Sequence, residues 1–166
     1  MSKIISNSSP IVGLSILGKL SLLKELFDEV FIPEAVYQEI VFGNTNAEYG
    51  KKELQEAVGR GDFTLYRVQN AELVRKLYGK LHEGELEVII GAKELGLRFV
   101  LMDEIAARKL ATQFLLRPIG VVGVLVLAKE SGKIAEVKPY LEQLMEHGFH
   151  ISQKLFRQVL TRLSEI

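Results

Sequence analysis

Apolar residues along the chain fall into short runs that are separated by longer segments of helical period. The runs are rich in β-branched and aromatic residues and lie at about 3–6, 29–32, 63–67, 98–102 and 117–119. Strands that alternate with helices are typical of a parallel sheet covered on both faces. The pattern therefore predicts an α/β fold, a three-layer α/β/α sandwich with a central, mainly parallel sheet.

The segments between these runs carry the boundary signals of helices. Pro33 and Glu34 follow the second run, and a proline and an acid suit the first turn of a helix, which we expect to continue through Glu39. A dense apolar set at 86–95 predicts a central helix with Glu85 in its first turn. Further helices are expected at 11–17, after Pro10, and at 105–114 and 120–130.

The C-terminal part, about 138–166, predicts two amphipathic helices separated by Gly148, with Ser152 as the N-cap of the second. The apolar stripe of that last helix fits either the core or a surface for a partner. A polar stretch at 43–52 predicts a surface loop. Because the chain has 166 residues and no repeat or low-complexity linker, we expect a single domain over 1–166.

Charge and cysteine content narrow the function classes. The 21 basic residues balance the 21 acidic ones, so any nucleic-acid binding must rest on a local patch. The chain has no cysteine, which excludes disulfides, zinc–thiolate sites and thiol nucleophiles. The longest apolar stretch, 119–128, contains two glycines and is too short to span a bilayer. We expect a soluble, cytoplasmic protein with no membrane partner.

Candidate chemistry gathers where predicted strands end. Asp103 and Glu104 directly follow the fourth apolar run, and Asn7 follows the first. In parallel sheets, ligands bind at the carboxyl ends of strands. Glu39 and Glu85 lie within apolar helical segments that could abut the same edge. Oxygen ligands without histidine or cysteine favour hard cations such as Mg²⁺ or Mn²⁺.

Each of these residues also has an ordinary structural interpretation. Asp103 or Glu104 could cap the helix that follows. Glu85 could be an acid that stabilises the first turn of its helix, and Glu39 could be a solvated helix residue. The segment 7–10 could form an Asx or Ser turn between strand and helix, which is compatible with a second role.

Five segments, which follow one another along nearly the whole chain, carry a family resemblance. They are Asn7-Ser8-Ser9-Pro10-Ile11-Val12, Gly18-Lys19-Leu20, Ile32-Pro33-Glu34-Ala35-Val36-Tyr37-Gln38-Glu39, Gly84-Glu85-Leu86-Glu87, and Asp103-Glu104 with Arg108 after it. Together they resemble the PIN-domain superfamily, and within it a group of small prokaryotic proteins.

The resemblance implies a ribonuclease that depends on Mg²⁺ or Mn²⁺, of the toxin type, acting on single-stranded RNA. It also implies an antitoxin protein as a partner and a homodimer as the assembly. Metal ions in such sites activate a bound water and neutralise charge on the transferred phosphate. By residue-wise transfer, the site comprises Glu39, Glu85 and Asp103 as catalytic metal ligands, Asn7 and Glu104 as further ligands, Ser9 as a supporting group and Arg108 as a nucleic-acid contact.

At Asn7 the chain departs from the family, which has an aspartate at that position. An amide oxygen can coordinate Mg²⁺, but it brings no negative charge and cannot act as a base. We expect the missing charge to weaken cation binding by on the order of 1–3 kcal/mol.

Two other functions remain open from the sequence. The first is a PIN-fold module that no longer cleaves and binds RNA or a protein instead. The second is an unrelated α/β binder of small molecules, for which no glycine-rich phosphate loop is present.

Overall fold

The computed structural model describes residues 2–43, 49–79 and 81–165. Five parallel strands form its central sheet, in the order β3-β2-β1-β4-β5. The strands are β1 (Lys3–Ser6), β2 (Glu29–Pro33), β3 (Phe63–Tyr66), β4 (Phe99–Leu101) and β5 (Arg117–Ile119). All five predicted strands are therefore present, and the predicted parallel α/β architecture is confirmed.

Helices connect the strands as crossovers. In the first half they are α1 (Ser8–Ile16), α2 (Leu22–Leu26), α3 (Glu34–Phe42) and α4 (Lys51–Gly59), and in the second half α5 (Ala71–Leu77), α6 (Glu83–Leu95) and α7 (Ile105–Gln113). Right-handed crossovers place α1–α4 on one face of the sheet and α5–α7 on the other. The packing of α1 on α3, and of α6 on both α5 and α7, agrees with this assignment. α3 and α6 also contact each other, at the turn where Gly84 approaches Val36.

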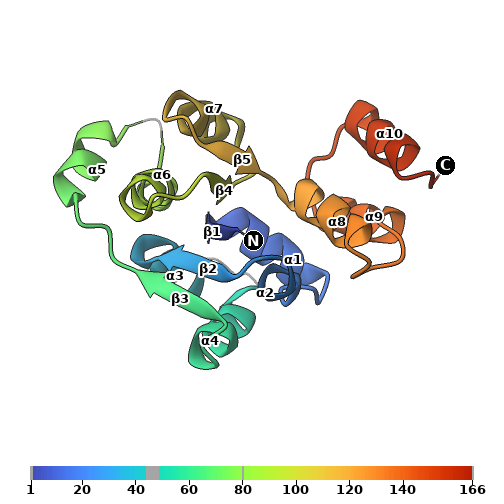
Figure 1. The fold of residues 1–166 in the computed structure, drawn as a ribbon, viewed down its shortest axis with the longest axis horizontal. Helices are drawn as coiled ribbons and strands as arrows, with labels where there is room; N and C mark the ends of the chain where they lie inside the picture. Colours follow the sequence, from blue (N-terminus) through green and yellow to red (C-terminus); the bar gives the residue numbers. More distant parts are fainter. Residues whose placement is uncertain (1, 44–48, 80, 166) are drawn as a thin grey trace.

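Three helices complete the chain after β5: α8 (Val121–Glu130), α9 (Lys138–Glu146) and α10 (Gln153–Arg162). Figure 1 shows α8 and α9 beside the sheet and α10, in red, as the outermost helix of this group. α8 packs on α1 and α2. The two amphipathic helices predicted at 138–166 are α9 and α10.

The core forms around the central strands because their residues are apolar on both faces. Ile4 and Ile5 of β1 and Val100 and Leu101 of β4 are fully buried. α6 supplies the densest helical contribution, and it packs against β1, β2 and β4. A parallel sheet covered on both sides requires such continuous apolar strands. The carboxyl ends of all five strands consequently lie along one edge.

Several element boundaries differ from the sequence expectations. α1 begins at Ser8, before Pro10, because Asn7 is the N-cap and a proline is tolerated in the first turn of a helix. The loop expected at 43–52 ends at Gly50, since Lys51 already opens α4, and its part at 44–48 lies outside the described residues. The helices α2, α4 and α5 were not predicted from the apolar pattern.

Candidate active site at the carboxyl edge of the sheet

The centre of the candidate site is formed by the ends of β1 and β4, which are neighbours in the sheet. Ser6 pairs with Leu101, and the Asn7 amide N–H donates to the Leu101 carbonyl over 2.8 Å. Asn7 is buried, with 3% of its surface exposed, and its side chain makes no capping bond to α1. The strand register thus brings Asn7 next to the segment that ends in Asp103.

Asp103 links β4 to the start of α8. Its Oδ1 atom accepts a hydrogen bond from the Val121 amide N–H over 3.0 Å, so it satisfies one of the free donors at that helix end. Gly120 permits this contact, because a Cβ at that position would lie 2.5 Å from Asp103 Oδ1. Part of the role of Asp103 is therefore capping, although of α8 rather than of the helix that directly follows it.

The second carboxylate oxygen of Asp103 is different. Within the described residues, Asp103 Oδ2 is buried and has no hydrogen-bond partner. Burial raises the pKa of this carboxyl above its ordinary value, while the Val121 amide and the Arg108 guanidinium act in the lowering direction and Glu104 in the raising one. A buried polar atom without a partner costs roughly 1–3 kcal/mol. Structural packing alone gives no reason for it.

Arg108 supplies the cation nearest to this carboxylate. Its Nη1 atom donates to the Met102 carbonyl over 3.0 Å, and the same atom lies 3.3 Å from the position of a Cβ on Gly120. α7 carries Arg108 on its first turn, one turn after Glu104, which explains why both reach the same edge. Glu104 itself is exposed.

Glu85 lies in the first turn of α6 and is buried, with 8% of its surface exposed. Its Oε1 atom accepts from the His82 amide N–H over 3.1 Å, so the first-turn role considered for it is present. The adjacent Gly84 brings this turn close to β1, since a Cβ there would lie 3.8 Å from Asn7 Oδ1. Asn7 thus lies between the start of α6 and the end of β4.

A groove of about 1120 Å³ opens beside Asp103 and runs along α8 toward α10. Ser9, Asp103, Glu104 and Arg108 all line it, so the structure brings four of the predicted site residues together. Glu39 is exposed on α3 and, like Asn7 and Glu85, is not part of the groove lining. The roles of Glu39 and Glu104 as metal ligands stay predictions.

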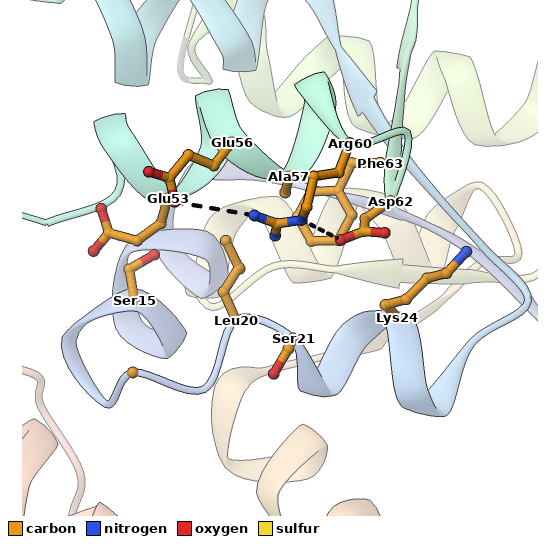
Figure 2. A pocket seen from close by; sticks show the side chains of 11 residues that line it. Ser15, Leu20, Ser21, Lys24, Glu53, Glu56, Ala57, Arg60, Asp62 and Phe63 are labelled. Carbon is orange, nitrogen blue, oxygen red and sulfur yellow. Dashed lines mark hydrogen bonds and ion pairs between the residues drawn. The ribbon is translucent and has the colours of Figure 1, made fainter.

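A second hollow, of about 180 Å³, lies between α4 and the segment that joins α1 to α2. Figure 2 shows Arg60 in its wall between two acids, Glu56 at 4.0 Å and Asp62 at 3.0 Å. The floor is apolar and includes Leu20, Ala57 and Phe63. Because the guanidinium is already neutralised, this hollow offers no free charge of Arg60 to an anionic ligand.

Comparison with known protein families shows to which family the chain is related. The family model DUF3368, described as a PIN domain, matches residues 3–165. The chain belongs to the PIN-domain family. No curated protein sequence matches this PIN domain significantly. This match confirms the family resemblance of the five segments, and the all-parallel sheet agrees with it.

PIN domains generally depend on divalent metal ions, so the donor set of this PIN domain has to be compared with that requirement. Across the described residues, no group of three or more histidines, cysteines, aspartates or glutamates could hold a metal ion. Asn7, Asp103 and Glu85 are the oxygen donors in this region, of which Asp103 lines the groove and the other two do not. Oxygen donors of this kind, one of them a buried carboxylate oxygen without a partner among the described residues, fit a hard cation. Asp103 and Glu85 bring two negative charges, whereas the four predicted acids would bring four.

The sequence missed two residues that shape this site. Gly120 and Val121 position Asp103, whereas the sequence analysis placed them only at the start of the helix expected at 120–130. The match of a PIN-domain model supports a nuclease-type fold in general. No helix in the described parts of the chain is long and apolar enough to cross a membrane.

Proposed function

We propose that this PIN domain is a metal-dependent ribonuclease that acts on single-stranded RNA, with Asp103 as its central metal ligand. The observation that supports this function best is the buried Asp103 Oδ2 atom at the carboxyl edge of a parallel sheet, which has no hydrogen-bond partner among the described residues. A cation at this position would satisfy that oxygen. Asn7 and Glu85 would contribute the neighbouring oxygen donors.

A bound Mg²⁺ or Mn²⁺ supplies an activated water and neutralises negative charge on the phosphate. The residues of the chain would bind the metal ion and the RNA and orient them. Val121 N–H holds Asp103 Oδ1 in place, and the Glu85 carboxylate is fixed by the His82 amide. The Arg108 guanidinium, which lines the groove beside Asp103, would contact a phosphate of the RNA.

Cleavage in this proposal needs no side-chain nucleophile. The bond that breaks is the phosphorus–oxygen bond of one phosphodiester, and the oxygen of a water forms the new bond to phosphorus. The proton of that water leaves to solvent, and the leaving oxygen of the ribose takes one up. Asn7 cannot accept the proton because an amide is not a base at neutral pH.

A matched pair of acids tests this function. Glu83 and Glu85 lie in the same turn of α6, but Glu83 is exposed whereas Glu85 is buried. Mn²⁺ binding is measured by calorimetry, and cleavage of a fluorescent single-stranded RNA is followed with and without EDTA. Asp103→Asn and Glu85→Gln should lose both properties, whereas Glu83→Gln should retain them. RNA cleavage that is insensitive to EDTA would refute the metal-dependent function.

A second function is favoured by Asn7 and Arg108. Asn7 stands where the family has a charged aspartate, and Arg108 places a positive charge beside Asp103. Both features weaken the binding of a metal cation at this edge of the sheet. A PIN domain that binds RNA or a protein without cleavage would have these features. In the same experiment, RNA binding without cleavage at saturating Mn²⁺ supports this second function.

The biological setting is part of the proposal. If the domain is a toxin, an antitoxin protein would bind it and block cleavage, and a homodimer would be the active form. Co-expression with the product of a small adjacent reading frame tests the first point. Light scattering of the purified chain, which reports its mass in solution, tests the second.

A further inference from the structure

α10 is attached to the rest of the molecule unevenly. Val159 and Leu160 are its buried residues, and Phe156 and the following Leu163 are half-buried against the core. Leu155 is 40% exposed, and the basic residues Lys154 and Arg157 are exposed. Figure 1 shows the helix as an outer layer beyond α8 and α9. The apolar contact of α10 is therefore modest compared with that of α6 or α8, and its position must depend on other contacts.

Those contacts gather at its C-terminal end, on the side chain of Glu165. The carboxylate accepts hydrogen bonds from the Val137 amide over 2.9 and 3.0 Å and from the Lys138 amide over 2.8 Å. Lys129 of α8 pairs with it over 2.6 Å. Only 6% of the Glu165 side chain is exposed. A carboxylate with this many donors is strongly held.

The donors explain why the partner is an acid. Val137 is the N-cap of α9 and has no side chain that can accept a hydrogen bond, so the first amides of α9 need an acceptor from elsewhere. Glu165 supplies it and also interacts favourably with the helix dipole. The Lys129 ammonium donates in addition to the Leu163 carbonyl over 3.0 Å.

The other end of α10 is attached by apolar contact alone, because Ile151 and Phe156 are half-buried against the core. Ser152 accepts from the Leu155 amide, which is a bond within the helix cap itself. Among the residues that the structure describes, no side-chain hydrogen bond or ion pair connects residues 153–158 to another element. Just before this segment, the Phe149 ring packs on α1, where its Cζ atom lies 3.0 Å from the position of a Cβ on Gly13.

The groove that begins at Asp103 ends under α10. Val122 and Val126 of α8 form one side of it, and Leu155 and Val159 of α10 form the other. The acids and bases that line this part include Arg162 and Glu130, which pair with each other over 3.2 Å. α10 is thus one wall of a groove that leads to the candidate active site.

We propose that α10 is a hinged wall of this groove, with Glu165 as the latch at one end and the exposed His150 as the hinge at the other. Phe149 fixes the chain before the hinge, and release of Glu165 lets α10 move as a unit away from α8. The proposal of a latch and a hinge depends only on the contacts described above and not on nuclease activity. The consequence for access to Asp103 rests on the proposed function.

Hydrogen exchange tests the latch without reference to nuclease activity. In Glu165→Gln, the charge is lost but the shape is kept, and we expect amides of 153–162 to exchange about tenfold faster while those of the central sheet are unchanged. Glu136→Gln is the matched control, because Glu136 is exposed and adjoins the same helix start. Unchanged exchange in α10, or an equal increase over the whole chain, would overturn the proposal.

A thiol probe tests whether the groove itself opens. The chain has no cysteine, so Val159→Cys introduces a single thiol at a position that is 8% exposed. Its reaction with a thiol reagent should be about tenfold faster when combined with Glu165→Gln than alone or with Glu136→Gln. Equal rates in all three proteins contradict a hinged wall.

The link to the site has its own measurement. If α10 limits access to Asp103, Glu165→Gln should change the KM for single-stranded RNA and leave kcat unchanged, because the metal ligands are untouched. A faster exchange with an unchanged KM overturns this link while the latch itself stands. A wild-type protein without any cleavage contradicts the proposed function and leaves the exchange test of the latch intact.

Discussion

The carboxylates of Asp103 and Glu165 each contact the start of a helix, but their surroundings are opposite. Each accepts hydrogen bonds from the first amides of a helix, α8 and α9 respectively. Glu165 has a lysine and several amides around it, and these hydrogen bonds and the charge of Lys129 lower its pKa. Asp103 has one amide, one buried oxygen without a partner, and a pKa that burial raises.

This difference separates an acid that stabilises the fold from an acid that is available to a ligand. A saturated carboxylate contributes to stability and has no capacity left for a cation. An unsaturated one costs free energy in the folded protein, and such a cost is typical of positions where a ligand completes the site. The following changes test whether the two acids really differ in this way.

The largest effect is expected from replacing Asp103. Asp103→Asn keeps an oxygen that can accept from Val121 but removes the charge that a cation needs. We expect Mn²⁺ affinity and the rate of RNA cleavage to fall by on the order of 100-fold. Replacing a residue that only hydrogen-bonds to a metal ligand already lowers metal affinity or activity by about 10–100-fold. Glu165→Gln, in the same calorimetric and cleavage assays, should leave Mn²⁺ affinity unchanged. Equal losses in both variants would show that the acids do not differ in role.

A smaller gain is expected from Asn7→Asp. The substitution restores a negative charge beside Asp103 and Glu85, so Mn²⁺ affinity should rise by about tenfold, within the range of on the order of 1–3 kcal/mol for a partly screened charge pair. Asn70→Asp is a control, because Asn70 is also an N-cap but lies on α5. Calorimetry reports both affinities. An unchanged affinity in Asn7→Asp would mean that the Asn7 side chain does not contact the cation.

Gly120 tests whether Asp103 is held in place by its helix end. In Gly120→Ala the new Cβ would meet Asp103 Oδ1 at 2.5 Å, so the carboxylate must move or the helix start must shift. We expect a loss of about 2 kcal/mol in the free energy of unfolding, typical of overpacking. Gly59→Ala in α4 has no atom near its new Cβ and should not destabilise the protein. Urea unfolding curves give both values.

The sequence predicted the fold well because strand and helix signals agree over long stretches. β1 and β4 are buried on both faces, so each appears in the sequence as a short continuous apolar run. The short helices α2 and α5 were missed because five to seven residues give too little periodic signal. α4 was missed as well, and its first two residues were assigned to the loop expected at 43–52. Pro10 misplaced the start of α1, since a proline fits any position of the first turn.

The site was predicted less completely than the fold. Asn7 and Asp103 are at adjacent strand ends, as expected from the parallel arrangement. The free oxygen of Asp103 depends on Gly120 and Val121 and on the burial of the carboxylate, which are properties of packing and not of pattern. Glu165 gave no signal at all, because its partners at 129 and 137 are distant in sequence and two of its donors are backbone amides.

The smallest expected effect is the acid sensitivity of the Glu165 latch. Its pKa is lowered in the folded protein by Lys129 and by the Val137 and Lys138 amides, so its contribution is present above the ordinary glutamate value of about 4.3 and is lost as the pH falls through the folded value. We expect about 1 kcal/mol of the unfolding free energy, and the protection of α10 amides, to disappear over this acid range. Glu165→Gln should flatten that part of the stability curve, whereas Glu136→Gln should retain it. Thermal unfolding in a pH series provides the measurement, and an identical acid limb in wild type and Glu165→Gln would mean that the carboxylate is not the group that holds α10.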